Sequence, residues 1–230
     1  MLNMMRLDLL GMKSFRLNMF LRMLIPIALL LFSSEPIFVI LMAAYFMQDN
    51  VFYTFVTEEK GQLNHLYMTL PVNRKIIVRA RFLLILIFLL VGITIGTILS
   101  IVGSMLLYGR TIILPHSFVP SFNAMLLTIS VSVLICGIVN LPSLPILLKT
   151  GYIRGKLIGF YLPSCAMAVF ILVATVLVNE YEPFREVVFP IVEWALRNTL
   201  STSAVLLGVA VLLFAASYFL AQRVYAKREF

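Results

Sequence analysis

The amino-acid sequence predicts an all-α integral membrane protein with six transmembrane helices. Three observations lead to this prediction: 62% of the 230 residues are hydrophobic, only 12% are charged, and the mean hydropathy is +1.04. About a quarter of the residues of an ordinary soluble domain are charged, so this composition excludes a water-soluble globule. A membrane-spanning helix takes roughly 20 apolar residues, which leaves room for about six spans and no separate soluble domain. We therefore treat residues 1–230 as a single transmembrane domain.

Four apolar stretches are long enough to cross the hydrocarbon core, at about residues 82–107, 122–148, 157–178 and 200–221. The region before them is harder to divide, because Ser33-Ser34-Glu35-Pro36 interrupts an apolar run. That interruption indicates either the outer tip of a two-helix hairpin or a kink in one helix. The choice between them gives six spans or five.

The distribution of basic residues favours six spans with both ends of the chain in the cytoplasm. Lys and Arg collect on the cytoplasmic side of membrane proteins. With the first two spans at about residues 18–33 and 36–53, 15 of the 18 Lys and Arg residues lie on that side, and Arg110, Arg185 and Arg197 lie outside. With five spans, the basic segment that holds Arg74 and Arg81 would face outward. Topology thus explains the net charge of +8, and we expect no nucleic-acid partner.

The segment before the first span, residues 1–20, alternates apolar and polar positions at helical spacing. Arg6, Lys13 and Arg16 fall within an arc of about 80° at 100° per residue. The segment is either an interfacial helix, with its apolar face in the acyl boundary and its basic face toward anionic lipid, or a basic extension of the first span. In the six-span topology Arg22 then reaches the headgroups, and Asp49 lies near the inner end of the second span.

The connection between the second and third spans predicts a short amphipathic helix at about residues 58–71. Leu63, Leu66, Tyr67 and Leu70 recur at i, i+3, i+4 and i+7, and Pro71 ends the helix. Such a helix lies on a surface or in the groove of a partner, and a solvated loop is the alternative. The connection is charged at both ends, by Glu58, Glu59 and Lys60 before the helix and by Arg74 and Lys75 after it.

At these residues the chain resembles the permease subunits of type-2 ATP-binding-cassette (ABC) exporters, in particular small bacterial six-span permeases. Those permeases carry a Glu-Lys pair after the second span and a Leu-Pro-Val-x-Arg-Lys run before the third, matched here by Glu59-Lys60 and residues 70–75. An aromatic-acidic pair that follows the Glu-Lys in the family is here Gln62-Leu63-Asn64. After the fourth span, Pro145 precedes a turn that is similar to the family's basic and glycine-rich turn, with Lys149, Gly151, Arg154, Gly155 and Lys156.

The resemblance implies a permease that pairs with a second copy or a paralogue and with separate ABC ATP-binding subunits. It would move an apolar or amphipathic substrate out of a bacterial cell; the chain is also similar to permeases that export phenol-soluble modulins, which are amphipathic peptide toxins. ATP and magnesium would bind the partner subunit, and no cofactor is implied in this chain. The inner connection would be a coupling helix that docks on the ATP-binding subunit through apolar anchors within a charged rim, formed by Glu58, Glu59, Lys60, Leu66, Tyr67, Leu70, Pro71, Arg74 and Lys75.

The chain is not expected to be an enzyme. Its nearest approach to a phosphate loop, residues 151–157, is one residue short of Gly-x4-Gly-Lys-Ser/Thr and ends in Leu157. The two histidines, His65 and His116, lie in predicted loops and make a poor metal or catalytic set, while Cys136 and Cys165 lie in apolar runs typical of buried packing residues. A small secondary carrier and a non-transport membrane scaffold are the alternative functions.

Two further features concern helix packing and the outer surface. Gly92 and Gly96 in the third span are spaced for close contact with another helix, within the chain or at a subunit interface. Residues 179–198 are too charged to span, but apolar residues repeat there at helical spacing. We expect two short helices that dip into the outer leaflet at about residues 183–196, and the resemblance implies an outer gate formed by Pro183, Phe184, Pro190 and Trp194.

Overall fold

The computed structural model describes residues 2–32, 38–60, 74–108 and 121–227, and all regular structure within these ranges is helical. The predicted all-α fold is confirmed for these residues. Only the first turn of the coupling helix predicted at residues 58–71 lies within the described residues. The elements are α1 (Leu2–Met12), a 3₁₀ turn η1 (Lys13–Phe15), α2 (Arg16–Phe32), α3 (Phe38–Asp49), α4 (Phe52–Lys60), α6 (Arg74–Tyr108), α7 (Phe122–Thr150), α8 (Tyr152–Gly155), a π-helical segment η2 (Lys156–Tyr161), α9 (Leu162–Glu180), α10 (Glu182–Arg197) and α11 (Thr199–Ala226).

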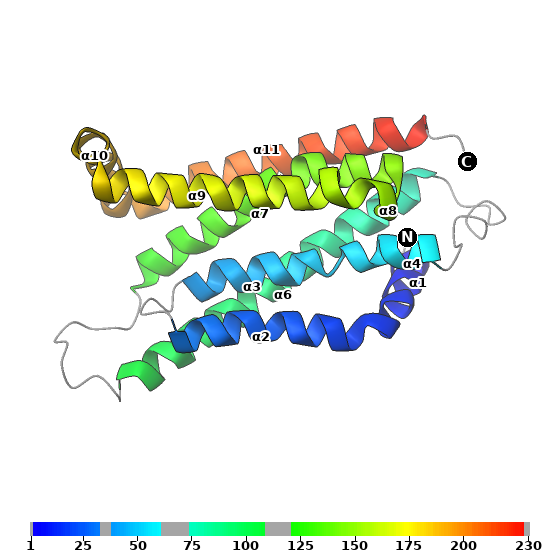
Figure 1. Cartoon of the computed structure of the whole chain (residues 1–230), viewed down its shortest axis with the longest axis horizontal. Helices are drawn as coiled ribbons and strands as arrows, with labels where there is room; N and C mark the ends of the chain where they lie inside the picture. The colour runs from blue at the N-terminus through cyan, green and yellow to red at the C-terminus, as the bar shows by residue number, and fades with distance from the viewer. Residues whose placement is uncertain (1, 33–37, 61–73, 109–120, 228–230) are drawn as a thin grey trace.

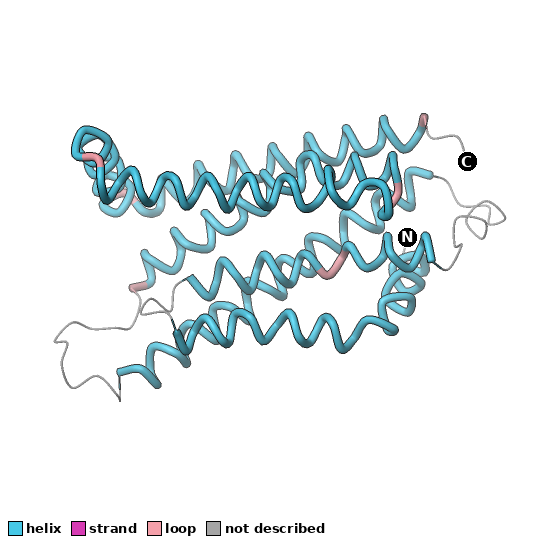
Figure 2. The backbone as a smooth tube through the Cα atoms, in the orientation of Figure 1, coloured by secondary structure: helices cyan, strands magenta, loops and turns pink. Residues whose placement is uncertain are grey.

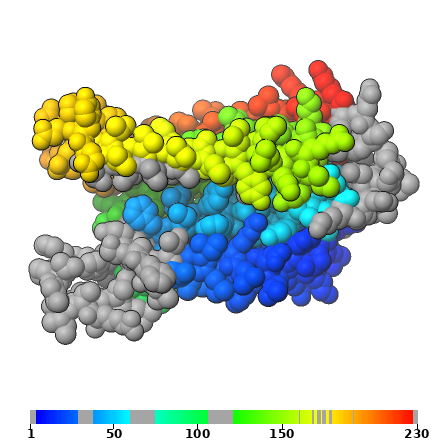
Figure 3. All heavy atoms as spheres, in the orientation of Figure 1, coloured from blue at the N-terminus to red at the C-terminus, as the bar shows by residue number. Residues whose placement is uncertain are grey.

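The long helices run side by side along the longest axis of the molecule (Figures 1 and 2). The two ends of the chain, α1, the end of α4 and α8 all lie at the same end of this bundle (Figure 1). At the opposite end, α10 lies across the axes of α9 and α11, which it connects (Figure 1), and its atoms form the upper left end of the space-filling view (Figure 3). Two segments separated in sequence, the end of α4 and the start of α8, are in contact at the first of these ends.

Four helical segments are long and apolar enough to cross a membrane: Phe38–Glu59, Lys75–Met105, Phe122–Thr150 and Thr199–Ala226. They coincide with four of the predicted spans. The spans predicted at residues 18–33 and 157–178 coincide with α2 and with η2 and α9, which run alongside the others (Figure 1). That α2 and α9 cross the membrane stays a prediction.

Small residues allow α3 and α6 to pack closely. A Cβ atom added at Gly92 would lie 2.8 Å from the Ala43 carbonyl oxygen, and one added at Gly96 would lie 2.8 Å from the Ile40 Cα. Real Cβ atoms do not approach backbone atoms this closely, so glycine is required at both positions while the helices keep this separation. The predicted close helix contact is confirmed, and its partner is α3 of the same chain.

The contact between α7 and α11 is the most extensive in the bundle. Ser217 donates a hydrogen bond of 2.9 Å to the carbonyl oxygen of Asn140, and Phe214 and Ala221 are buried beside it. Several other hydroxyl groups bond carbonyl oxygens one turn back in their own helices, as Thr97 does with Ile93. These groups are therefore satisfied within the bundle in the manner usual for spanning helices.

The structure bears on one of the two alternatives predicted for the N-terminal segment. α1 meets α2 at an angle through η1 (Figure 1), so it is not a straight extension of the first predicted span. Its buried residues, Met4, Met5, Asp8 and Met12, pack against α4 and α6. Leu9 and Leu10 are exposed, as are Arg6 and Lys13. The protein thus covers part of the apolar side of α1 and leaves Leu9 and Leu10 exposed. That α1 lies at the membrane interface stays a prediction.

The segment predicted to lie on the outer side, residues 179–198, also differs from expectation. α10 continues from Glu182 to Arg197 as a single helix through Pro190, where a break between two short helices was expected. A proline removes one helical hydrogen bond, and its freed carbonyl is tolerated where it is exposed, as the residues around Pro190 are. Pro183 lies in the first turn as predicted, Phe184 is half-buried, and Trp194 is exposed.

The two cysteines were both predicted to be buried packing residues. Cys136 is buried, but Cys165 is exposed on α9.

Candidate functional site

The end of α4 carries the two adjacent carboxylates Glu58 and Glu59, and both are engaged by other parts of the chain. Arg81 of α6 donates a hydrogen bond from Nη2 to Glu58 Oε2 and forms an ion pair with it. The side chain of Arg81 is fully buried, and its guanidinium lies over the ring of Phe55, 4.4 Å from the centroid. Glu58 is buried too, so its predicted place in an exposed charged rim is wrong for this structure. Its charge is instead compensated inside the protein, as a buried charge requires.

The neighbouring carboxylate of Glu59 reaches the second inner connection. Glu59 Oε2 accepts a hydrogen bond of 2.6 Å from the backbone N–H of Ile153, in the first turn of α8. The first N–H groups of a helix have no partner within the helix, so a carboxylate at this point satisfies one of them. This hydrogen bond joins residues that are 94 positions apart in the sequence.

Gly151 makes the turn that presents Ile153 to Glu59. Its backbone has φ 77° and ψ 178°, a conformation that residues with a Cβ rarely adopt. A Cβ atom at Gly151 would also lie 3.2 Å from Glu59 Oε1. The turn and the carboxylate are thus matched to each other, and glycine satisfies both requirements.

Two more glycines let α8 and η2 fold back against the end of α7. A Cβ atom at Gly155 would clash with the hydroxyl of Thr150, and one at Gly159 would lie 3.0 Å from Ile146 Cγ2. Lys149, Arg154 and Lys156 are exposed around this turn. The second inner connection therefore presents basic side chains from a tightly packed backbone.

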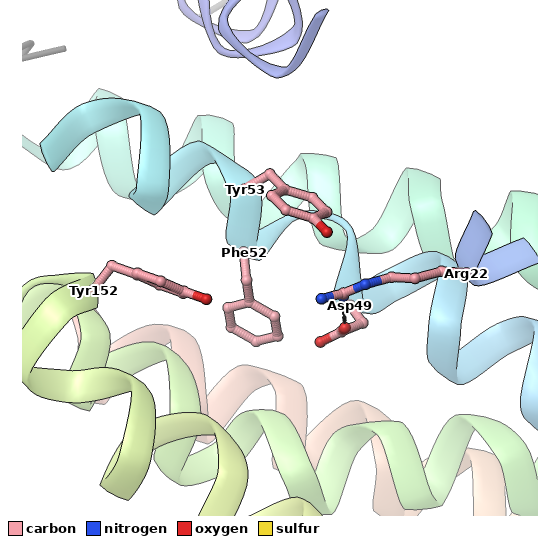
Figure 4. A pocket seen from close by; sticks show the side chains of 5 residues that line it. All are labelled: Arg22, Asp49, Phe52, Tyr53 and Tyr152. Carbon is pink, nitrogen blue, oxygen red and sulfur yellow. Dashed lines mark hydrogen bonds and ion pairs between the residues drawn. The ribbon is translucent and has the colours of Figure 1, made fainter. Parts of the chain in front are cut away.

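A second ion pair lies at the junction between the end of α3 and the start of α4. Arg22 of α2 pairs with Asp49 of α3, and its guanidinium lies 4.9 Å from the ring centroid of Tyr53 (Figure 4). Asp49 thus holds Arg22 against the protein. That Arg22 also reaches the lipid headgroups stays a prediction. Sequence reasoning missed this pair; the basic and acidic residues near the inner ends of neighbouring spans were the available signal.

Arg22, Asp49 and Tyr53 line a small pocket together with Phe52 and Tyr152 of α8 (Figure 4). Its space of about 10 Å³ is enough for about one water molecule and far too small for a transport substrate. Partial burial raises the pKa of the Tyr152 phenol, so this group is neutral at physiological pH. The pocket is therefore a structural junction between α2, α3, α4 and α8.

The remaining predicted docking residues are only partly within the described residues. Lys75 is exposed at the start of α6. Lys60 is the last residue of α4 and Arg74 is the first residue of α6, and only the backbone of each is described. Leu66, Tyr67, Leu70 and Pro71 lie outside the described residues. The structure thus brings Glu59 together with Gly151 and Ile153, and it places the start and the end of the inner connection on α4 and α6.

Comparison with known proteins identifies the class to which this membrane-embedded bundle belongs. The sequence matches the family described as "ABC-2 family transporter protein" over residues 3–226, nearly the whole chain. No curated protein and no solved structure matches it significantly. The chain belongs to the ABC-2 transporter family and is a membrane-embedded permease component of an ABC transporter.

Proposed function

We propose that this permease exports an apolar or amphipathic substrate, with peptides as one candidate class, across a bacterial cell membrane. Separate ABC ATP-binding subunits bind ATP and magnesium and supply the energy, and the permease itself catalyses no reaction. Membership of the ABC-2 family supports the transport role. The observation that supports the coupling role is the pair of contacts at the end of α4, just before the inner connection. There Glu58 contacts α6 and Glu59 contacts α8.

The topology in this proposal has six spans with both chain ends in the cytoplasm. The positions of α2 and α9 beside the four apolar spans support it (Figure 1). The exposed basic residues Lys75, Lys149, Arg154 and Lys156 occupy helix ends on one side of the proposed membrane plane. Since Lys and Arg concentrate on the cytoplasmic side, this end of the bundle faces the cytoplasm.

The inner connection, residues 61–73, is the proposed docking element for an ATP-binding subunit. Leu66, Tyr67, Leu70 and Pro71 supply apolar anchors, and Lys60, Arg74 and Lys75 supply charges at its margins. The exposed basic residues of the second inner connection extend this charged surface. Glu58 is excluded from the docking set because Arg81 holds it in the interior.

Two further parts of the proposal concern assembly and the outer end. A second permease copy or a paralogue completes the transport path, since one chain of this size has little room for an enclosed path. α10 lies across the outer end of the bundle, and its partly buried Phe184 and exposed Trp194 suit a helix at the membrane interface (Figure 1). We assign it the role of an outer gate, with Pro183 and Pro190 shaping the helix.

Charge substitutions on the inner connection test the docking role. Changing Leu66 and Leu70 together to Asp places two charges in the proposed apolar interface, and we expect loss of co-purifying ATP-binding subunit. The matched control changes Asn64 and His65 to Asp, which adds two charges to the polar face of the same segment. Unchanged binding of the ATP-binding subunit by the Leu66/Leu70 variant would contradict the proposed docking element.

A further inference from the structure

We infer that Glu59 is a positioning residue that ties the inner connection to α8, η2 and α9, so that movement of the connection passes to the far end of the bundle. This inference rests on the proposed function, because it presupposes an ATP-binding subunit that moves residues 61–73. It assigns Glu59 a role different from docking on that subunit. The hydrogen bond from the Ile153 N–H to Glu59 Oε2, at 2.6 Å, is the physical link.

On one side of the link, Glu59 is fixed to the base of the inner connection. It stands one residue before Lys60, the last residue of α4, and next to Glu58. The ion pair between Glu58 and the buried Arg81 anchors this turn of α4 to α6, on which the connection ends. A displacement of the connection therefore acts on the helix turn that carries the Glu59 carboxylate.

On the other side, Ile153 belongs to a helix that continues to the outer end. The backbone remains helical from α8 through η2 into α9, where the N–H of Leu162 bonds the carbonyl oxygen of Leu157. α9 in turn contacts α10 (Figure 1). The helical backbone is thus a continuous path from Ile153 to α10, and η2, as a π-helical segment, is the place in this path where the helix can bend.

The link is an exposed hydrogen bond whose direction is set by the turn at Gly151. A carboxylate that accepts a backbone N–H bond makes a charge-assisted hydrogen bond, which is stronger than a bond between neutral groups. The Gly151 backbone at φ 77° sets the direction of the Ile153 N–H, and the absence of a Cβ leaves space for the carboxylate. An ordinary helix cap is supplied by the residue just before the helix, whereas this acceptor comes from another helix.

A transmitted movement can be measured by the distance between spin labels at the outer end. Arg185→Cys on α10 and Phe122→Cys at the start of α7 place labels at exposed positions, after Cys136→Ala and Cys165→Ala remove the native thiols. The complex of the full chain with its ATP-binding subunit is measured without nucleotide and after trapping with ATP, magnesium and vanadate. Glu59→Ala removes the acceptor, Ile153→Pro removes the donor, and Ile153→Ala is the control that keeps the N–H.

We expect trapping to shift the label distance in the wild-type background and with Ile153→Ala, and most of that shift to be lost with Glu59→Ala and with Ile153→Pro. The double variant should lose no more than either single variant, because both remove the same hydrogen bond. Glu59→Gln, which keeps an acceptor oxygen, should restore part of the shift. Binding of the ATP-binding subunit should be unchanged in all variants.

A full shift in Glu59→Ala with the subunit bound would overturn the inference and leave the proposed function intact. Loss of subunit binding in Glu59→Ala would also overturn it, since Glu59 would then be a docking residue. If the wild-type chain binds no ATP-binding subunit, or shows no shift on trapping, the proposed function fails and the inference fails with it. Thermal unfolding of each variant separates these results from loss of the fold.

Discussion

Arg81 of α6 and Glu58 of α4 form a buried ion pair across the base of the inner connection. Glu58 precedes residues 61–73 in the sequence and Arg81 follows them. The ion pair therefore joins the helix before the inner connection to the helix after it. Phe55 covers the guanidinium of Arg81 and helps to exclude water from it. The pair therefore links α4 to α6 through their side chains.

Removing one partner of this pair should be costly. Arg81→Met leaves the Glu58 carboxylate buried without its compensating charge, and we expect the free energy of unfolding to fall by about 3–5 kcal/mol. Thermal unfolding of the purified permease in detergent measures the loss. The double variant Glu58→Gln and Arg81→Met removes both charges and should recover much of the stability.

Arg223→Met is a suitable control for that experiment, because Arg223 is exposed in the last turn of α11. We expect it to change the free energy of unfolding by less than about 1 kcal/mol. If Arg81→Met were no more destabilising than Arg223→Met, the pair would not anchor α4 to α6.

The close contact of α3 and α6 makes a second prediction about stability. Gly96→Ala places a Cβ atom 2.8 Å from the Ile40 Cα, which forces the helices apart and should cost about 1–3 kcal/mol. Gly208→Ala is the matched control, because no atom lies within 4 Å of its added Cβ and alanine favours the helix. Equal melting temperatures for the two variants would show that α3 and α6 do not pack as described.

The backbone of Gly151 makes a third prediction. Gly151→Ala strains the turn by about 1–3 kcal/mol and places a Cβ atom 3.2 Å from Glu59 Oε1. We expect the turn to loosen and trypsin to cleave faster after the exposed Arg154 and Lys156 in detergent. Gly137→Ala is the control, since its nearest neighbour would lie at an ordinary 3.5 Å. Identical cleavage rates for the two variants would show that the turn at Gly151 does not require a glycine beside Glu59.

Asp49 distinguishes the proposed exporter from a secondary carrier. Its carboxylate pairs with Arg22, so Asp49→Asn should weaken the contact of α2 with α3 by about 1–3 kcal/mol. It should not introduce or remove any dependence on an ion gradient. We therefore expect the ATPase rate of the reconstituted complex to be the same with and without proton and sodium gradients, in the wild type and in the variant. A gradient dependence that Asp49→Asn abolishes would instead favour ion-coupled transport.

Much of the bundle could be predicted from the sequence, because apolar length is a direct signal of a helix in a membrane. The apolar runs that became α6, α7 and α11 needed no tertiary information. The close contact at Gly92 and Gly96 also followed from residue size and spacing. By contrast, α10 runs through Pro190 where a break was expected, because local preference does not show whether the freed carbonyl is exposed.

The partners of the charged residues could not be predicted in the same way. Glu58 and Glu59 are adjacent in sequence, and both looked like members of an exposed charged rim. Successive residues of a helix point about 100° apart, so one carboxylate meets α6 and the other meets α8. Which helix lies on which side is a property of the folded bundle. The pairing of Arg22 with Asp49 escaped prediction for the same reason.

The most direct test of the central claim is purification of the tagged full-length chain in mild detergent, with mass identification of co-purifying subunits and an ATPase assay. The account predicts a stoichiometric nucleotide-binding subunit that carries a phosphate loop, and ATP hydrolysis that vanadate inhibits. A chain that purifies alone and shows no ATPase activity when membranes are solubilised gently would contradict the account and favour a secondary carrier or a membrane scaffold.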